Sequence, residues 1–112
     1  MKFVISNTLK VEKGYGEKLM ERFHKMGDVE NAPGFMQLNL LQVKNTDEYD
    51  EFVIWSQWES KEAHEEWTKT EQFRDTHRGP RSKEIIDSNI VFYDVVAERE
   101  LGALEEKRQD AI

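Results

Sequence analysis

The chain has 112 residues, a formal net charge of −7, 38% hydrophobic and 35% charged residues, and no cysteine. This length allows one domain with a single core, and the composition is typical of a soluble globular protein. The acidic balance argues against nucleic-acid binding, and the lack of cysteine excludes disulfides, Fe–S clusters and a covalent c-type haem site.

The sequence also predicts the cellular location of the protein. No apolar run approaches the roughly 20 residues of a membrane span, so we expect no membrane association. The N-terminus enters a strand-like alternation at once and leaves no room for a signal peptide. A cytoplasmic location follows by default.

The first predicted strand covers residues 2–11, and one polar residue interrupts its apolar face. That face holds Phe3, Ile5, Leu9 and Val11, with Asn7 among them. Asparagine is depleted in strands, and a buried amide left unpaired costs about 1–3 kcal/mol. Two interpretations stay open, a core amide bonded to neighbouring backbone and an amide donor directed into a pocket.

Three helices are predicted. Apolar residues at helical spacing indicate the first, which ends at about residue 27: Tyr15, Leu19, Phe23 and Met26. Ser60 and Thr70 are placed to cap two short helices later in the chain. Phe73 and His77 lie four residues apart in the second of these, so their side chains are neighbours.

Three further strands are predicted at residues 35–44, 51–58 and 89–97, each with apolar residues on both faces. A change of phase near Leu40 and Leu41 indicates a bulge in the first of them. The order β-α-β-β-α-β is that of the α+β ferredoxin-like fold, in which the helices cover one face of an antiparallel sheet. The uncovered apolar face would be larger than monomers usually show, so we expect a homodimer packed sheet to sheet.

The segment of residues 66–83 reverses the sign of charge locally. It contains Trp67 and His77, and basic residues surround the histidine: Arg74, Arg78, Arg81 and Lys83. A flat, apolar, anionic ligand that needs an axial nitrogen would suit this segment, and haem is such a ligand. Ten helical residues would separate Trp67 from His77 by ~15 Å, so both serve one pocket only if the helix breaks near Thr70.

Asn7, Trp67, and His77 followed by Arg81-Ser82-Lys83 resemble the IsdG-type haem-degrading monooxygenases, members of the antibiotic biosynthesis monooxygenase superfamily. The resemblance covers residues 1–97 as one ferredoxin-like domain and leaves 98–112 as a charged C-terminal extension. It implies a dimeric α+β barrel with one haem per subunit. The extension and the additional His64, a competing iron ligand, are the departures from the family pattern.

The resemblance also implies roles for individual residues. His77 is the axial iron ligand, since neutral imidazole suits haem iron, and it leaves the other face of the ring free for dioxygen. Asn7 donates a hydrogen bond towards the bound oxygen, and Trp67 presses on the porphyrin face. The implied haem contacts also include Phe73, Arg78 and Arg81. The alternatives are that Trp67 is only a core residue and His77 only a helix-terminal residue favoured by the dipole.

Haem would then be both cofactor and substrate, opened by O2 with external electrons so that iron is released. The chain shows no motif for a flavin or a nicotinamide, so a separate electron donor or reductase is an expected partner. Two other functions stay open. One is a cofactor-free quinol or polyketide monooxygenase of the same superfamily, and the other is a haem-binding carrier without turnover.

Overall fold

A computed structural model describes residues 1–25, 27–77 and 82–102 of the chain. Its elements are β1 (Phe3–Val11), α1 (Gly16–His24), the short 3-10 helix η1 (Val29–Asn31), β2 (Phe35–Gln42), β3 (Asp50–Trp58), α2 (Lys61–Thr68), α3 (Glu71–Thr76) and β4 (Ile85–Asp94). This order confirms the predicted ferredoxin-like fold, with its second helix divided into α2 and α3. In the ranges described, no helix is both long and apolar enough to cross a membrane.

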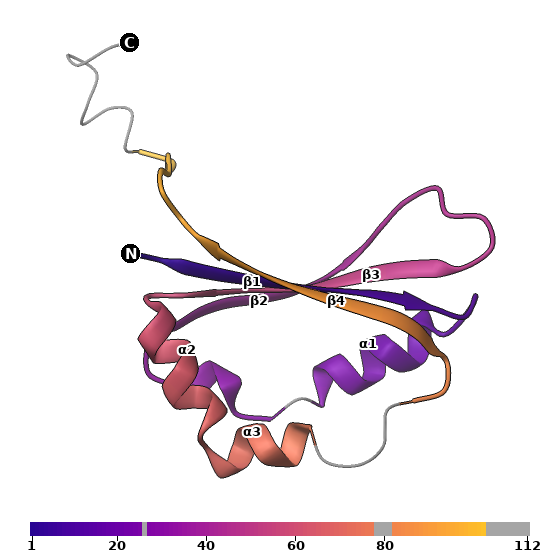
Figure 1. Ribbon diagram of the computed structural model, residues 1–112, viewed down its shortest axis with the longest axis horizontal. Helices are drawn as coiled ribbons and strands as arrows, with labels where there is room; N and C mark the ends of the chain where they lie inside the picture. The colour runs from indigo at the N-terminus through magenta and orange to yellow at the C-terminus, as the bar shows by residue number, and fades with distance from the viewer. Residues whose placement is uncertain (26, 78–81, 103–112) are drawn as a thin grey trace.

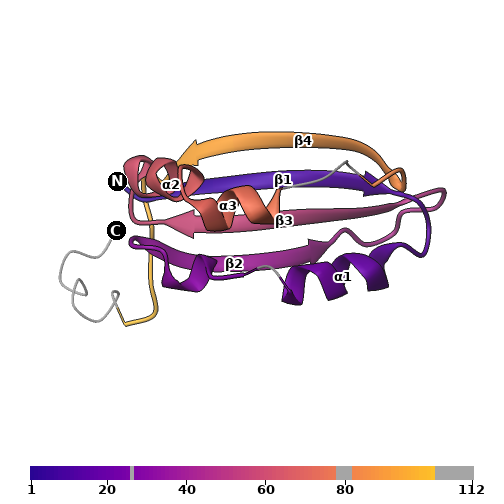
Figure 2. The same cartoon turned by 90° about the horizontal axis from the view of Figure 1, so that it is seen from below.

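The four strands form one antiparallel sheet in the order β2-β3-β1-β4. Figure 1 shows α1, α2 and α3 together on one side of this sheet, and Figure 2 shows the molecule from that side, with α1 and α3 running roughly along the strands. In the centre of the sheet Asn7 of β1 lies between Ile54 of β3 and Ile90 of β4. The residue that interrupts the apolar pattern is therefore central in the sheet.

The core beneath the helices consists of two separate clusters. One contains Leu9, Val11, Tyr15, Leu19 and Phe52, and the other contains Phe3, Ile5, Val29 and Trp58. Along β1, Asn7 occupies the helix-facing position between the two clusters. The alternation predicted for this strand is confirmed, and its single polar member marks the gap in the core.

The predicted break between the second and third helices is also confirmed. The Ser60 hydroxyl accepts the amide of Ala63 at 3.1 Å and so caps α2. The Thr70 hydroxyl accepts the amide of Phe73 at 3.2 Å to cap α3, and it donates to the carbonyl of Trp67 at 2.7 Å. One threonine therefore ends α2 and starts α3.

Two details of the strands differ from the predictions. The pairing of β2 with β3 is continuous from Gln37 to Gln42, and its irregularity lies between Phe35 and Gln37. The bulge predicted near Leu40 and Leu41 is therefore wrong. These two neighbours face opposite sides of the sheet, as successive strand residues do. Strand β4 begins at Ile85, because Ile85 pairs with Val11, and it ends at Asp94.

The sheet face opposite the helices remains uncovered in the part of the chain that is described (Figure 1). It carries Val4, Val53, Trp55, Leu41, Val91 and Tyr93. Leu41 and Tyr93 are 47% and 44% exposed. The hydroxyls of Ser6 and Tyr93 lie 3.1 Å apart on this face. The face is therefore apolar with a few polar groups, as expected from the sequence.

The turn before β2 packs closely on α2. Gly34 has a positive φ of 84°, and its carbonyl accepts the amide of Glu59 at 2.8 Å. A Cβ at Gly34 would lie only 2.5 Å from the Cβ of Ala63. Glycine is therefore required here both for the backbone conformation and for space.

Candidate active site

A cavity of about 560 Å³ lies between the sheet and the helices, and its walls include Leu9 and Leu19 of the first core cluster. The sheet contributes Asn7, Leu40 and Ile54, α1 contributes Arg22 and Phe23, and the end of α3 contributes Asp75, Thr76 and His77. We refer to it as the inner cavity. Asn7 and His77, which are far apart in the sequence, line this cavity, whereas Trp67 and Phe73 do not.

His77 ends α3, and its ring has a defined orientation. Its Nδ1 lies 2.9 Å from the carbonyl oxygen of Phe73. A carbonyl only accepts, so Nδ1 carries a hydrogen, and in the neutral form of the ring the lone pair is on Nε2. The imidazole also stacks on the Phe73 ring, with centroids 4.0 Å apart and an interplanar angle of 30°. A neutral imidazole held in this tautomer is suited to bind a metal through Nε2.

The ring of Phe73 lies between Trp67 and His77 and contacts both. The Trp67 and Phe73 ring centroids are 6.3 Å apart in an edge-to-face arrangement, and Trp67 lies 6.5 Å from Trp58 on the other side. Trp67 and His77 also line a common small cavity of about 90 Å³. The helix break at Thr70 thus brings the two side chains together, and Phe73 lies between them.

Asn7 supplies an unsatisfied polar atom to the site. Its Oδ1 is buried and has no hydrogen-bond partner among the described residues. Such an atom costs about 1–3 kcal/mol, and its strand neighbours Ile54 and Ile90 offer no side-chain donor. This geometry favours the interpretation of Asn7 as a ligand-facing amide.

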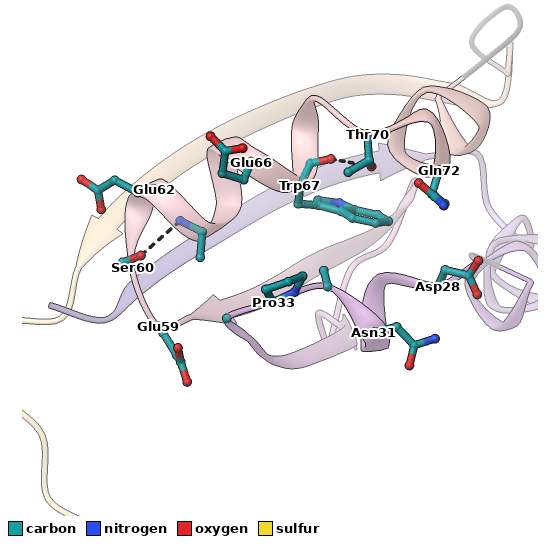
Figure 3. A pocket seen from close by; sticks show the side chains of 13 residues that line it. Asp28, Asn31, Pro33, Glu59, Ser60, Glu62, Glu66, Trp67, Thr70 and Gln72 are labelled. Carbon is teal, nitrogen blue, oxygen red and sulfur yellow. Dashed lines mark hydrogen bonds between the residues drawn. The ribbon is translucent and has the colours of Figure 1, made fainter.

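A larger cavity of about 790 Å³ lies between α2 and the segment of residues 28–34, with Trp67 in its wall. We call it the outer cavity. Figure 3 shows the indole of Trp67 projecting towards Pro33 across this space. Acidic side chains line it: Asp28, Glu59, Glu62 and Glu66. These carboxylates repel an anionic ligand, so a dicarboxylate such as haem is better accommodated by the inner cavity.

The basic residues of the inner cavity come from α1 and from the residue that follows it. Arg22 and Lys25 line it beside Asp75. Arg74 and Lys83, which the sequence also suggested, are exposed and do not line it. Arg78 and Arg81 lie outside the described residues. Sequence reasoning missed Arg22 and Lys25 because basic residues on the polar side of an amphipathic helix are usually only solvated.

His64 lies in a different environment from His77. Its ring packs edge-on against Trp58, with centroids 5.3 Å apart, and lies 6.0 Å from the ring of Phe3. Burial lowers the pKa of His64 below its ordinary value, although the charge of Glu65 acts in the opposite direction. His64 lines the small cavity but not the inner cavity, so only His77 shares a cavity with Asn7.

Comparisons with known proteins identify the family of this chain. Residues 2–79 match the antibiotic biosynthesis monooxygenase family. A haem-degrading monooxygenase of Bacillus cereus is 45% identical over 94 residues, which cover 82% of this chain and 88% of that protein.

Solved structures of MhuD, a haem degrader from Mycobacterium tuberculosis, have the same fold. The structure with two haems in its active site has a TM-score of 0.66 and 28% identity, covering 88% of this chain and 99% of that one. A variant with two manganese protoporphyrin IX molecules per active site has a TM-score of 0.71 and 28% identity, covering 88% and 98%. The family match includes both β1 and the helices that carry Trp67 and His77. The chain therefore belongs to the antibiotic biosynthesis monooxygenase family.

Proposed function

We propose that this chain is a haem-degrading monooxygenase that binds haem in the inner cavity. The observation that carries this proposal is the shared cavity of Asn7 and His77, with the Nε2 lone pair of His77 free. The similarity to haem-degrading proteins supports it. Haem is the substrate, and the reaction opens the porphyrin with O2 and external electrons and releases iron.

His77 is the proposed axial ligand. The hydrogen bond from its Nδ1 to Phe73 holds the ring and makes Nε2 a better donor to iron. The ring contact with Phe73 restricts the imidazole further. These two contacts orient His77 before the ligand arrives, so less freedom is lost on binding.

Asn7 and Trp67 are proposed to act on the reaction and not mainly on affinity. The amide of Asn7 lies on the sheet wall of the inner cavity, where it can donate to oxygen that gains negative charge. Trp67 does not line the inner cavity, but it shares the small cavity with His77, lies against Phe73 and is backed by Trp58, so its indole resists displacement by a bound ring. That resistance is the physical basis for pressure on the porphyrin.

The carboxylates of haem require cationic partners. Arg22 of α1 and Lys25, which follows α1, line the inner cavity and suit this role, together with Arg78 and Arg81, which the family resemblance implies. A guanidinium binds a carboxylate through two parallel hydrogen bonds, so Arg22 gives orientation as well as charge. Lys25 contributes less, because it also pairs with Glu21 at 3.4 Å.

The proposal includes a homodimer, an unidentified electron donor or reductase, and a cytoplasmic location. The uncovered apolar face of the sheet supports the dimer, in which two copies pack sheet to sheet as an α+β barrel. Residues 98–112 are proposed to be an extension beyond the ferredoxin-like domain of residues 1–97.

The proposed function is tested by adding hemin to the purified protein and following the Soret band under air with ascorbate or a reductase. We expect the band to appear on binding and to disappear on turnover, and mass spectrometry should find an opened tetrapyrrole. A stable band under these conditions would indicate a carrier. The absence of any band would favour a cofactor-free monooxygenase of the same family.

A further inference from the structure

A chain of hydrogen bonds runs from the inner cavity to the start of β4. The guanidinium of Arg22 donates to the Tyr15 hydroxyl at 3.0 Å, and that hydroxyl donates to Ser82 at 3.1 Å. The Ser82 hydroxyl in turn donates to the carboxylate of Glu84. The four side chains come from two segments separated by most of the chain.

The direction of every bond in this chain is fixed by its two ends. A guanidinium only donates, and a carboxylate only accepts. Each hydroxyl between them must therefore accept from the Arg22 side and donate towards Glu84. The bond from Ser82 also lowers the pKa of Glu84, which keeps the terminal carboxylate ionised. The arrangement is a polarised network with no competing orientation.

Tyr15 is the fixed point of this network. Its side chain is 7% exposed and packs in the core cluster with Leu9, Val11 and Leu19. Tyr15 does not line the inner cavity, whereas Arg22 does. A hydroxyl on a buried ring thus holds the guanidinium of an exposed side chain that faces the cavity.

We propose that Tyr15 is a positioning residue of the haem cavity, whose hydroxyl holds Arg22 ready for a porphyrin carboxylate. This inference rests on the proposed function, in which the inner cavity receives haem. A free arginine side chain loses considerable rotamer entropy when it binds. Because Tyr15 and Ser82 restrict Arg22 in advance, that loss is smaller and the carboxylate binds more tightly.

The test uses metal-free protoporphyrin IX and its dimethyl ester, with binding followed by porphyrin fluorescence. Both probes lack iron, so ligation by His77 does not contribute. The ester lacks the carboxylate charges, so it reports the shape of the cavity alone. We expect the parent protein to bind the diacid about tenfold more tightly than the ester.

Tyr15→Phe keeps the buried ring and removes only the hydroxyl. We expect it to weaken binding of the diacid about threefold to tenfold and to leave the affinity for the ester unchanged. In the Arg22→Gln background the same substitution should have no further effect, since the hydroxyl acts through Arg22. Tyr49→Phe is the matched control, because Tyr49 packs under Lys10 away from the cavity and should leave both probes unaffected.

Ser82→Ala is a second variant, which leaves the buried Tyr15 ring intact. It should weaken binding of the diacid but not of the ester. An equal loss of diacid and ester binding in Tyr15→Phe would overturn the inference, as would additive effects of Tyr15→Phe and Arg22→Gln. A parent that degrades hemin but binds diacid and ester equally would overturn this inference alone. A parent with the expected binding pattern but without aerobic haem degradation would contradict only the proposed function.

Discussion

The imidazole of His77 donates from Nδ1 to the backbone carbonyl of Phe73 at 2.9 Å, and the two rings stack with centroids 4.0 Å apart. Both contacts lie within α3 and its last turn, so they form as soon as Thr70 caps that helix. The orientation of the candidate iron ligand is thus a local property of a six-residue helix. It does not depend on the distant sheet.

His77→Ala should abolish tight haem binding, since no other histidine lines the inner cavity. The measurement is a hemin titration followed by the Soret band. His64→Ala is the matched control and should retain the parent spectrum. The opposite result, with the band lost in His64→Ala and kept in His77→Ala, would show that the axial ligand is His64.

Asn7→Ala should bind hemin nearly as well as the parent but degrade it ~10²–10³ times more slowly, because one preorganised donor is lost. The melting temperature should not fall, since the buried Oδ1 has no partner to lose. Thermal melting and the aerobic decay of the Soret band measure the two effects. A large loss of stability with an unchanged rate would make Asn7 a structural amide.

Trp67→Phe should bind hemin but degrade it more slowly than the parent, because the smaller ring presses less on the porphyrin. Trp67→Ala is a poorer test, since a full truncation opens a cavity that costs about 3–5 kcal/mol. Product analysis by mass spectrometry should accompany the rates. Parent-like rates in both Trp67→Phe and Asn7→Ala would rule out the proposed distal site.

His64 predicts a pH dependence of stability. In the folded chain, burial lowers its pKa below the ordinary 6.5, so the unfolded state binds more protons below that pH. The free energy of unfolding should therefore fall as the pH decreases from about 6.5. Above that pH His64 is neutral in both states and does not lower the stability. His64→Phe should flatten this part of the melting profile. His24→Gln, at an exposed position of α1, should leave the profile unchanged.

The proposed dimer predicts that sedimentation equilibrium at micromolar concentration finds no folded monomer. Leu41→Glu should separate the copies, since Leu41 is 47% exposed on the uncovered face. Met20→Glu is the matched control, because Met20 is 46% exposed but lies on α1, on the other side of the sheet. A parent that sediments as a stable monomer would refute the dimer.

The sequence predicted those features that depend on local physics. The alternation of β1 placed Asn7 on the helix-facing side, and the side chains of Ser60 and Thr70 predicted the caps at which α2 and α3 begin. From that division, the proximity of Trp67 and His77 followed by geometry. These inferences needed only periodicity, capping and the rise of a helix.

Features that depend on the contacts between elements were less accessible. The position of the bulge in β2 is set by pairing with β3, so the phase of the apolar residues near Leu40 predicted it in the wrong place. Arg22 belongs to the cavity only because α1 packs over the sheet beside His77. The role of the Tyr15 hydroxyl could not be predicted for the same reason. The apolar spacing along the helix predicts that the ring is buried, but not which groups its hydroxyl bonds.

Gly34 also determines how closely the turn before β2 approaches α2. Its absent side chain lets the turn before β2 touch Ala63 of α2, and these two segments form opposite walls of the outer cavity. Even one methyl group at Gly34 would have to push α2 outwards, and Trp67 would move with it. The separation of these two walls is therefore limited by the contact between Gly34 and the side chain of Ala63. A single carbon added at Gly34 would therefore change the pressure on the porphyrin that we propose for Trp67.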